Sequence, residues 1–321
     1  RYDGDFKKVI DHINDFQNIF DSKLLEPKHV QPKSILTSQE WVESSAKVGE
    51  VEKDYLKSRG LNDQILNNPE INRVLRKYAY ENKKGYVNDY LAFPLINKDL
   101  ECTGYELRSK PTENYSGKFS APGSSKEESF WICNYKKSNT EAFMGEGPID
   151  ILSYIQLKGF NPNATYMATT GRFGQRKGQH MIDLIKSTAA TKISFLNDND
   201  IHGQSYNLML ASIISNYGNE KTYPYVKARG LKNGSISITI SNSNNLFKRI
   251  VDQSFDDINY LTMKDDYIAL DAKYSIESIN KMIEGIQRVS KGPAMKNEAS
   301  KSKDWNKDLE NSLEINHEKQ R

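Results

Sequence analysis

The sequence predicts an α/β protein, with a parallel sheet flanked by helices, a smaller α+β unit before it and an N-terminal helical segment. Two observations predict this class. Apolar strands alternate with helical segments over residues 141–215 with short connections, which is typical of a parallel sheet covered by helices. Short strands also precede that region, between residues 86 and 133, where the hydrophobic period changes from helical to alternating.

The composition describes a folded protein with a very polar surface. Of its 321 residues, 37% are hydrophobic and 27% are charged, which allows about two packed domains. The net charge is +3 and the pI is near 8.5, so any basic face must be local and charge alone does not establish nucleic-acid binding. No apolar run approaches the ~20 residues of a membrane span, and the N-terminus does not resemble a signal peptide, so we expect no membrane partner.

Cysteine usage and the first residue bear on where the protein works. Cys102 and Cys133 are the only cysteines and lie far apart, so they offer neither a disulfide framework nor a metal-binding pair. This favours a reducing, cytoplasmic location. Because the chain begins at Arg1 rather than Met, we expect an excised fragment or a processed form.

Helical spacing dominates the first quarter of the chain. Residues 1–24 predict one amphipathic helix, and the proline-containing stretch 25–36 predicts a linker. Residues 38–58 predict a second helix, for which Gly60 is a suitable C-cap, and residues 61–77 predict a third.

Strands begin near Tyr86. The first predicted strands are 90–96 and 102–108, joined by a turn at 97–99, and a third is 129–133. After them the strands 142–146, 165–170 and 192–196 alternate with the helices 149–158, 175–187 and 203–215.

These elements divide the chain into four parts. They are a helical segment and linker at 1–50, a basic α+β unit at 51–140, the parallel-sheet domain at 141–310 with a long insertion at about 218–295, and a mobile tail at 311–321. Within the insertion we expect a strand at 235–240 and a helix at 276–289. The chain beyond Ser290 is charged and poor in apolar residues, so we expect much of it to be mobile.

Acidic residues follow two of the predicted parallel strands, at the edge where such sheets bind ligands. Glu146 ends one strand, and Asp198 and Asp200 follow another with the alternate spacing that lets both point toward one site. Grouped carboxylates suit Mg²⁺, which prefers oxygen ligands and retains waters for a phosphate substrate. The alternative is ordinary turn chemistry, because Asp and Asn accept backbone hydrogen bonds where strands end.

The motifs around these acids resemble the TOPRIM family over roughly residues 141–215. The first TOPRIM motif is a strand ending in E-G-x-x-D, the middle strand ends in a small-residue and glycine turn, and the second motif is D-x-D-x-x-G opening a helix. The matching segments are GEGPID (145–150), ATTG (168–171) and LNDNDIHG (196–203). The resemblance implies a TOPRIM parallel sheet and catalytic Mg²⁺ or Mn²⁺ held by Glu146, Asp198 and Asp200.

A further resemblance lies at residues 303–309. KDWNKDL resembles the K-D-W-N-x-x-L that closes TOPRIM domains in primase-like proteins of plasmids, phages and conjugative elements. It implies that Asp304 is an additional metal-binding acid. The long stretch between Tyr217 and Lys303 departs from a minimal TOPRIM domain.

The upstream unit is similar to the region that precedes TOPRIM in the same primase-like group. The matching segments are YLKSRGL (55–61), TGYELR (103–108), GKFS (117–120) and GSSK (123–126). In bacterial replicative primases the corresponding region is a basic ridge that holds template and nucleotide phosphates. The resemblance therefore implies phosphate contacts at Arg59, Arg108, Lys118 and Lys126, with Tyr115, Phe119 and Trp131 as candidates to stack on bases.

Solvated lysines and core aromatics are the alternative reading of this unit, and Glu106 dilutes its positive charge. The Gly-rich stretch 171–178 lacks the G-K-[ST] ending of a nucleotide P-loop. A helix start flanked by Arg172, Arg176 and Lys177 can still contact phosphate, so Arg172 joins the candidate contacts.

Three functions are compatible with these features. The first is a primase-like nucleotidyltransferase that uses single-stranded DNA and nucleotides in mobile-element replication or transfer, with a helicase or relaxase of that element as a candidate partner. The second is a TOPRIM nuclease, and the third is a non-catalytic nucleic-acid-binding module in plasmid mobilisation. The upstream unit favours the first. Missing zinc ligands count against autonomous priming, since primases of this type usually carry an N-terminal zinc module.

Overall fold

The structure is a computed structural model that describes residues 37–319, except 82–86, 110–116, 172, 217–224, 242–244, 265 and 291. The helix and linker expected within the first 36 residues lie outside the described residues. The described residues all fall within one unit, Leu36–Arg321. In this part of the chain no helix is long and apolar enough to cross a membrane. Both cysteines are buried and free, as expected.

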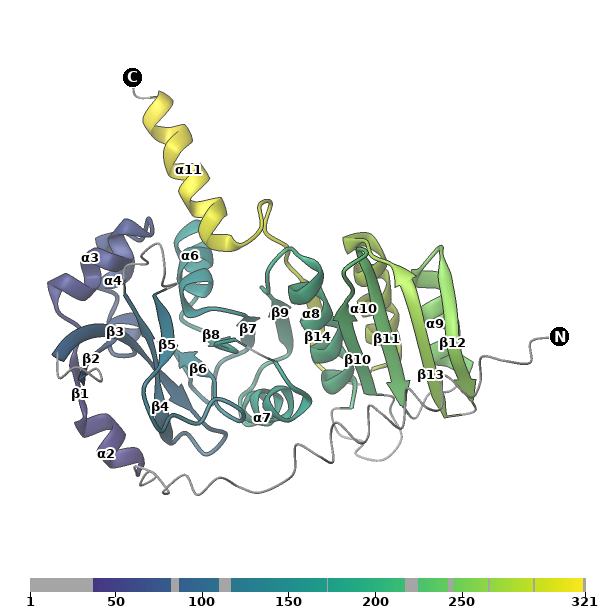
Figure 1. The fold of residues 1–321 in the computed structure, drawn as a ribbon, viewed down its shortest axis with the longest axis horizontal. Helices are drawn as coiled ribbons and strands as arrows, with labels where there is room; N and C mark the ends of the chain where they lie inside the picture. The colour runs from purple at the N-terminus through teal and green to yellow at the C-terminus, as the bar shows by residue number, and fades with distance from the viewer. Residues whose placement is uncertain are drawn as a thin grey trace. The chain divides into compact units, whose positions relative to one another are not determined.

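An antiparallel sheet forms the upstream unit. Its strands are β1 (Ser45–Lys47), β2 (Arg76–Glu81), β3 (Val87–Ile96), β4 (Cys102–Arg108) and β5 (Lys118–Ser120), in that spatial order (Figure 1). Its helices are α2 (Ser38–Glu43), α3 (Glu50–Ser58), α4 (Asp63–Leu66) and α5 (Pro69–Asn72). Strands β3 and β4 confirm the predictions at 90–96 and 102–108. Strand β4 pairs with both β3 and β5 and therefore lies between them.

The helix expected over 38–58 is wrong in extent, because β1 interrupts it. Gly49 has an extended backbone and is the N-cap of α3, so a new helix begins after it. The short strand β1 pairs with β2, a contact about 30 residues away in sequence that local periodicity does not reveal. Gly60 has φ +85°, the left-handed conformation that glycine favours after a helix, which confirms its predicted role in ending α3.

The helix expected over 61–77 is also wrong in extent. It is two short helices, and the side chain of Asn68 caps the second one in front of Pro69. Pro69 suits a first helical position and not a helix interior, so the helical pattern cannot run through it.

A second sheet carries the parallel core. Its strands are β6 (Trp131–Cys133), β7 (Glu141–Gly145), β8 (Ala164–Ala168), β9 (Lys192–Phe195) and β14 (Ala294–Asn297), in the spatial order β14-β9-β7-β8-β6. Strand β7 is parallel to both β8 and β9, which confirms that the strands predicted at 142–146, 165–170 and 192–196 share one sheet. Strand β6, expected at 129–133, is antiparallel to β8 at the edge of this sheet.

Helices cover both faces of the parallel sheet. They are α6 (Pro148–Lys158), α7 (Gln175–Lys186) and α8 (Ile201–Ser215). Phe143 of β7 packs in the core that contains α6, whereas its neighbours Ala142 and Met144 pack in the core that contains α7 and α8. Alternate residues of one strand therefore point to opposite faces, and the loops that follow β7, β8 and β9 gather at the carboxyl edge.

A third, antiparallel sheet accounts for the long stretch after α8. Its strands β10 (Tyr225–Gly230), β11 (Ser235–Ser241), β12 (Ile258–Lys264) and β13 (Tyr267–Lys273) lie in the order β10-β11-β13-β12. Helices α9 (Asn245–Ser254) and α10 (Ile276–Val289) lie on one side of it (Figure 1). Ile236, Ile238 and Ile240 alternate into the core shared with α8, as the alternating pattern predicts. The strand predicted at 235–240 and the helix at 276–289 are confirmed.

The chain beyond Ser290, expected to be largely mobile, contains β14 and the helix α11 (Trp305–Lys319). Strand β14 extends the parallel sheet by pairing with β9. Helix α11 is mostly polar and is anchored to the core around α6 by Trp305 and Leu309. Composition misses both elements because β14 has only four residues and α11 is rich in charged residues, although Trp305, Leu309 and Leu313 follow helical spacing.

Candidate functional site

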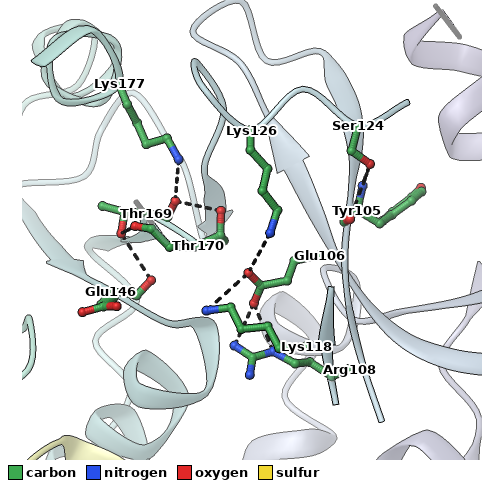
Figure 2. A network of polar contacts seen from close by, with 11 residues as sticks. Tyr105, Glu106, Arg108, Lys118, Ser124, Lys126, Glu146, Thr169, Thr170 and Lys177 are labelled. Atoms are coloured by element: carbon green, nitrogen blue, oxygen red, sulfur yellow. Dashed lines mark hydrogen bonds and ion pairs between the residues drawn. The ribbon is translucent and has the colours of Figure 1, made fainter. Parts of the chain in front are cut away.

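Glu146 lies at the carboxyl edge of the parallel sheet, directly after β7. Its backbone carbonyl accepts hydrogen bonds from Thr170 N at 2.9 Å and Thr169 Oγ1 at 3.3 Å, which tie the end of β7 to the end of β8 (Figure 2). Thr170 has φ +57°, a left-handed conformation that is unusual for a β-branched residue. Backbone strain of this kind persists only where surrounding contacts enforce it, and it clusters at functional sites.

Gly147 and Asp150 shape the start of α6 beside Glu146. Gly147 is the extended N-cap of this helix, and a Cβ there would lie 2.4 Å from Asp150 Oδ2. Glycine at 147 therefore leaves room for the Asp150 carboxyl, which gives the E-G-x-x-D spacing a physical reason. Burial, together with the charges of Asp304 and Glu146, raises the pKa of Asp150 to about 7 against the effect of Arg108.

Asp198 and Asp200 lie in the loop between β9 and α8. A Cβ on Gly203 would lie 2.2 Å from the backbone oxygen of Asp198, so the glycine of D-x-D-x-x-G is required by this close approach. Asp200 is the N-cap of α8, and its Oδ1 accepts from His202 N and Gly203 N, both at 3.0 Å. One carboxylate oxygen of Asp200 therefore caps the helix, which is the turn role that the sequence left open. Its Oδ2 makes no hydrogen bond to any other described residue.

Asn199 brings the C-terminal segment to the same loop. Its backbone N–H donates to Lys303 O at 2.7 Å, and its Nδ2 donates to Ser300 O at 2.8 Å. Asp304 follows immediately and starts α11, where its Oδ1 accepts from Lys307 N at 2.7 Å. The charge of Asp304 contributes to the raised pKa values of Asp150 and Asp198, so the structure places it within electrostatic reach of both.

Glu146, Asp150, Asp198, Asp200 and Asp304 form one group, which we call the acid cluster. Burial, together with the charges of the other four, raises the pKa of Asp198 to about 8. Burial also raises the pKa of Glu146. Mutual repulsion among these carboxylates favours the binding of a cation between them. Their hard oxygen atoms suit Mg²⁺ or Mn²⁺, so the residues present fit a divalent cation.

The acid cluster is not a closed metal site. Over the residues that the structure describes, no three acidic, histidine or cysteine side chains converge closely enough to hold a metal ion. Mutual repulsion gives a reason, because like charges without a cation favour separation. An open arrangement also suits Mg²⁺, which commonly keeps waters and takes substrate phosphates as ligands.

Arg108, Lys118 and Lys126 converge on Glu106, and we call these four residues the basic cluster (Figure 2). Glu106 is fully buried. Its Oε1 accepts from Arg108 Nη2 at 2.8 Å, and its Oε2 lies 3.6 Å from Lys118 Nζ and 3.5 Å from Lys126 Nζ. Glu106 therefore gathers the three cations, where the sequence suggested only that it dilutes their charge.

The basic cluster acts electrostatically on the acid cluster. Burial raises the pKa of Glu146, and the charge of Lys118 is the largest opposing influence, lowering that pKa. Arg108 and Lys118 likewise lower the pKa of Asp150 against the effect of burial. Cations of the upstream sheet and carboxylates of the parallel sheet thus border one region.

Lys177 is a residue that the sequence interpretation placed only among weak phosphate contacts. It is 2% exposed, and its Nζ donates to Thr169 O at 2.8 Å (Figure 2). Burial and, to a lesser extent, the charge of Lys126 lower its pKa to about 8. Its helical spacing could have revealed this, because residue 177 lies four positions before Met181 and seven before Leu184, on the buried face of α7.

Arg59, also predicted to contact phosphate, instead links α3 to α11. Its guanidinium donates to Asn306 Oδ1 and lies 3.7 Å from Glu310. Asn306 is buried and donates in return to Arg59 O at 2.8 Å and to Ser153 Oγ at 3.1 Å. The asparagine of K-D-W-N therefore fastens α11 to the core. None of these contacts of Arg59 reaches the basic cluster.

The remaining candidates divide between the core and the undescribed residues. Trp131, proposed to stack on bases, is fully buried and its Nε1 lies 3.4 Å from Val74 O, so it is a core residue. Phe119 is half-buried and packs against the rings of Tyr80 and Tyr90. Arg172 and Tyr115 lie outside the described residues.

Comparison with known proteins identifies the class of the parallel-sheet domain. Residues 143–229 match the model of a family described as Toprim-like. The chain therefore contains the TOPRIM domain that its motifs predict. No curated protein sequence matches the chain.

Several solved primase structures are similar to this chain at low identity. The zinc-binding and RNA polymerase domains of the Aquifex aeolicus primase match with a TM-score of 0.34 and 16% identity, covering 51% of this chain and 48% of that one. The primase fragment of the bacteriophage T7 primase-helicase matches with a TM-score of 0.36 and 10% identity, covering 60% and 72%. The E. coli primase catalytic core matches with a TM-score of 0.33 and 17% identity, covering 51% and 60%. The chain thus spans about half the length of the Aquifex structure.

Proposed function

We propose that this chain is a primase-like, metal-dependent nucleotidyltransferase that synthesises short oligonucleotides on a single-stranded DNA template, in the replication or transfer of a mobile element. One observation carries the proposal. The basic cluster borders the acid cluster closely enough for Lys118 to lower the pKa of Glu146. A nucleotide has a polyphosphate that needs cations and a reacting phosphorus that needs metal-bound oxygens, so such a substrate uses both clusters at once.

The residues of the two clusters have distinct roles in this proposal. Lys118 and Lys126, each with a side chain 32% exposed, neutralise the phosphates of the incoming nucleotide. Glu146, Asp198 and Asp200 hold Mg²⁺ or Mn²⁺, with Asp304 as a further ligand. Bound there, the metal supplies charge neutralisation at the reacting phosphate and lowers the pKa of the attacking hydroxyl.

The chemistry of the other side chains is in keeping with this assignment. Burial raises the pKa of Cys133 to about 12 and raises that of Cys102 as well, so neither thiol is an activated nucleophile. Phosphoryl transfer depends on positioning and charge stabilisation more than on a covalent nucleophile. The proposed setting is the cytoplasm, with a helicase or relaxase of the same element as partner.

The test is to incubate the protein with single-stranded DNA, labelled nucleotides and Mg²⁺ or Mn²⁺, with Asp198→Asn as control. Products longer than one nucleotide that are absent from the control support the proposal. Metal-dependent loss of template without synthesis would select a TOPRIM nuclease instead. Template binding with neither activity would leave a non-catalytic module of plasmid mobilisation.

A further inference from the structure

Glu106 is a fully buried carboxylate that faces three cations from three segments of the chain. Arg108 shares its strand β4, Lys118 lies on β5, and Lys126 lies in the loop after β5. In Figure 2 the three side chains approach the carboxylate from different sides. Removing a carboxylate from water is costly unless it is paired, so its position has to be explained by what it holds.

The contacts of Glu106 are of two kinds. Arg108 donates to Oε1 from Nη2 at 2.8 Å and from Nε at 3.1 Å, which fixes the carboxylate. The Nζ atoms of Lys118 and Lys126 lie 3.6 and 3.5 Å from Oε2, which is buried and has no hydrogen-bond partner among the described residues. These distances are long for a hydrogen bond. The two ammonium groups are therefore held by charge, and their N–H groups remain free to donate to a ligand.

The cluster holds more positive charge than its own packing needs. Arg108 alone neutralises the charge of Glu106, yet Lys118 and Lys126 also lie beside this carboxylate. Lys177 interacts electrostatically with Glu106 and with both lysines. Burial lowers the pKa of Lys126, and among its neighbours Glu106 most opposes that change while Lys118 and Arg108 reinforce it. Without Glu106 the lysines would repel one another, and Lys126 would lose its proton more readily.

A compact polyanion matches this arrangement better than a strand of nucleic acid. Several cations converge on one carboxylate, whereas a single strand presents one charge per nucleotide along its length. A purely structural ion pair would be complete with Arg108, and buried pairs are weak contributors to stability.

We propose that Glu106 is a positioning residue for the polyphosphate of the incoming nucleotide: fixed by Arg108, its carboxylate holds Lys118 and Lys126 in place and aimed toward the acid cluster. The identity of the ligand as a nucleotide rests on the proposed function. The positioning role is tested by phosphate binding and not by oligonucleotide synthesis. Either this role or the proposed function can therefore fail while the other stands.

The experiment compares three variants of the whole chain by calorimetric titration with inorganic tripolyphosphate at pH 7 and pH 9. Glu106→Gln removes the charge and keeps the shape, and Glu106→Asp keeps the charge and shortens the reach. Glu127→Gln is the matched control, because Glu127 is exposed and its charge also acts on Lys177. A single-stranded oligonucleotide is titrated in parallel.

We expect both Glu106 variants to bind tripolyphosphate about tenfold more weakly, although Glu106→Gln makes the cluster more positive. The loss is larger at pH 9 for Glu106→Gln, because Lys126 then deprotonates at lower pH. Glu127→Gln binds as tightly as the native chain or more tightly. If net charge alone governs binding, Glu106→Gln binds more tightly and Glu106→Asp is unchanged, which overturns the proposal.

Three further outcomes are informative. If Glu106→Gln does not fold, Glu106→Asp decides alone, and native-like affinity in that variant contradicts the positioning role. If the Glu106 variants lose only oligonucleotide affinity and keep tripolyphosphate affinity, the polyphosphate assignment is wrong. Weakened tripolyphosphate binding in a protein that makes no oligonucleotides would keep the role of Glu106 and remove the proposed function.

Discussion

Lys118 lowers the pKa of Glu146, although the two residues belong to different sheets. Lys118 lies on the short strand β5, and Glu146 follows the central strand β7. Their proximity brings the cations of the upstream unit to the carboxyl edge of the parallel sheet. Substitutions on each side of this junction should therefore have distinct and separable effects.

Asp198→Asn should stabilise the metal-free protein near pH 8 and have little effect near pH 4. Burial raises the pKa of Asp198 to about 8, against about 3.9 in an unfolded chain. Between these values the folded state binds more protons than the unfolded state, so the native free energy of unfolding falls as pH rises. Urea unfolding in EDTA at both pH values measures the gap in the free energy of unfolding between Asp198→Asn and the native chain. Equal gaps at the two pH values would mean that the Asp198 carboxyl is not perturbed.

Asp200→Asn and Asp200→Ala should separate capping from catalysis. Asn also caps helices well, so Asp200→Asn keeps the fold, whereas Asp200→Ala loses two hydrogen bonds and about 1 kcal/mol of stability. Both variants should lose metal-dependent activity. Stability comes from urea titration and activity from nucleotide incorporation. Normal turnover in Asp200→Asn would leave Asp200 as a helix cap only.

Replacing Lys118 or Lys126 by Ala should weaken binding of a fluorescent nucleoside triphosphate and flatten its salt dependence, because each variant loses a contact to the phosphates. Arg108→Ala should do so and also destabilise the fold by about 3 kcal/mol, because it leaves the buried Glu106 carboxylate without its hydrogen bonds. Fluorescence anisotropy between low and moderate salt gives the slopes. Slopes equal to the native value would make these side chains bystanders.

Lys177→Met should abolish a rise in stability that the native chain shows above pH 8. Burial lowers the pKa of Lys177 to about 8, against about 10.4 when unfolded. Between these values the unfolded state binds more protons, so the native free energy of unfolding increases with pH. Other groups titrate in this window, and the difference between the native chain and Lys177→Met isolates residue 177. Parallel curves would show that Lys177 is not perturbed.

The parallel sheet could be predicted from sequence because its signals are local. Each apolar strand is followed by a small-residue turn and a helix, so the sequence alone is enough to place Glu146 and Asp198 at one edge. The elements that could not be predicted depend on distant partners. Strand β1 exists because β2 pairs with it, and β14 because β9 lies beside it.

The acidic part of the site could also be predicted from the sequence, whereas the buried charged residues beside it could not. Its acids lie in motifs with fixed spacing, and the structure adds Asp150, whose place in E-G-x-x-D was visible but whose burial was not. Glu106 and Lys177 were missed as functional residues because charged side chains in sequence suggest solvent. Their burial depends on strands and helices that meet only in the fold.

The central claim is template-directed nucleotidyl transfer, and the most direct measurement is incorporation of one labelled nucleotide on homopolymer templates. With Mg²⁺ or Mn²⁺ and labelled ATP or dATP, we predict oligonucleotides on oligo(dT), none on oligo(dA), and none with Asp198→Asn. Two results would contradict the account: products that form equally on both templates, or no products on either template although the protein binds both.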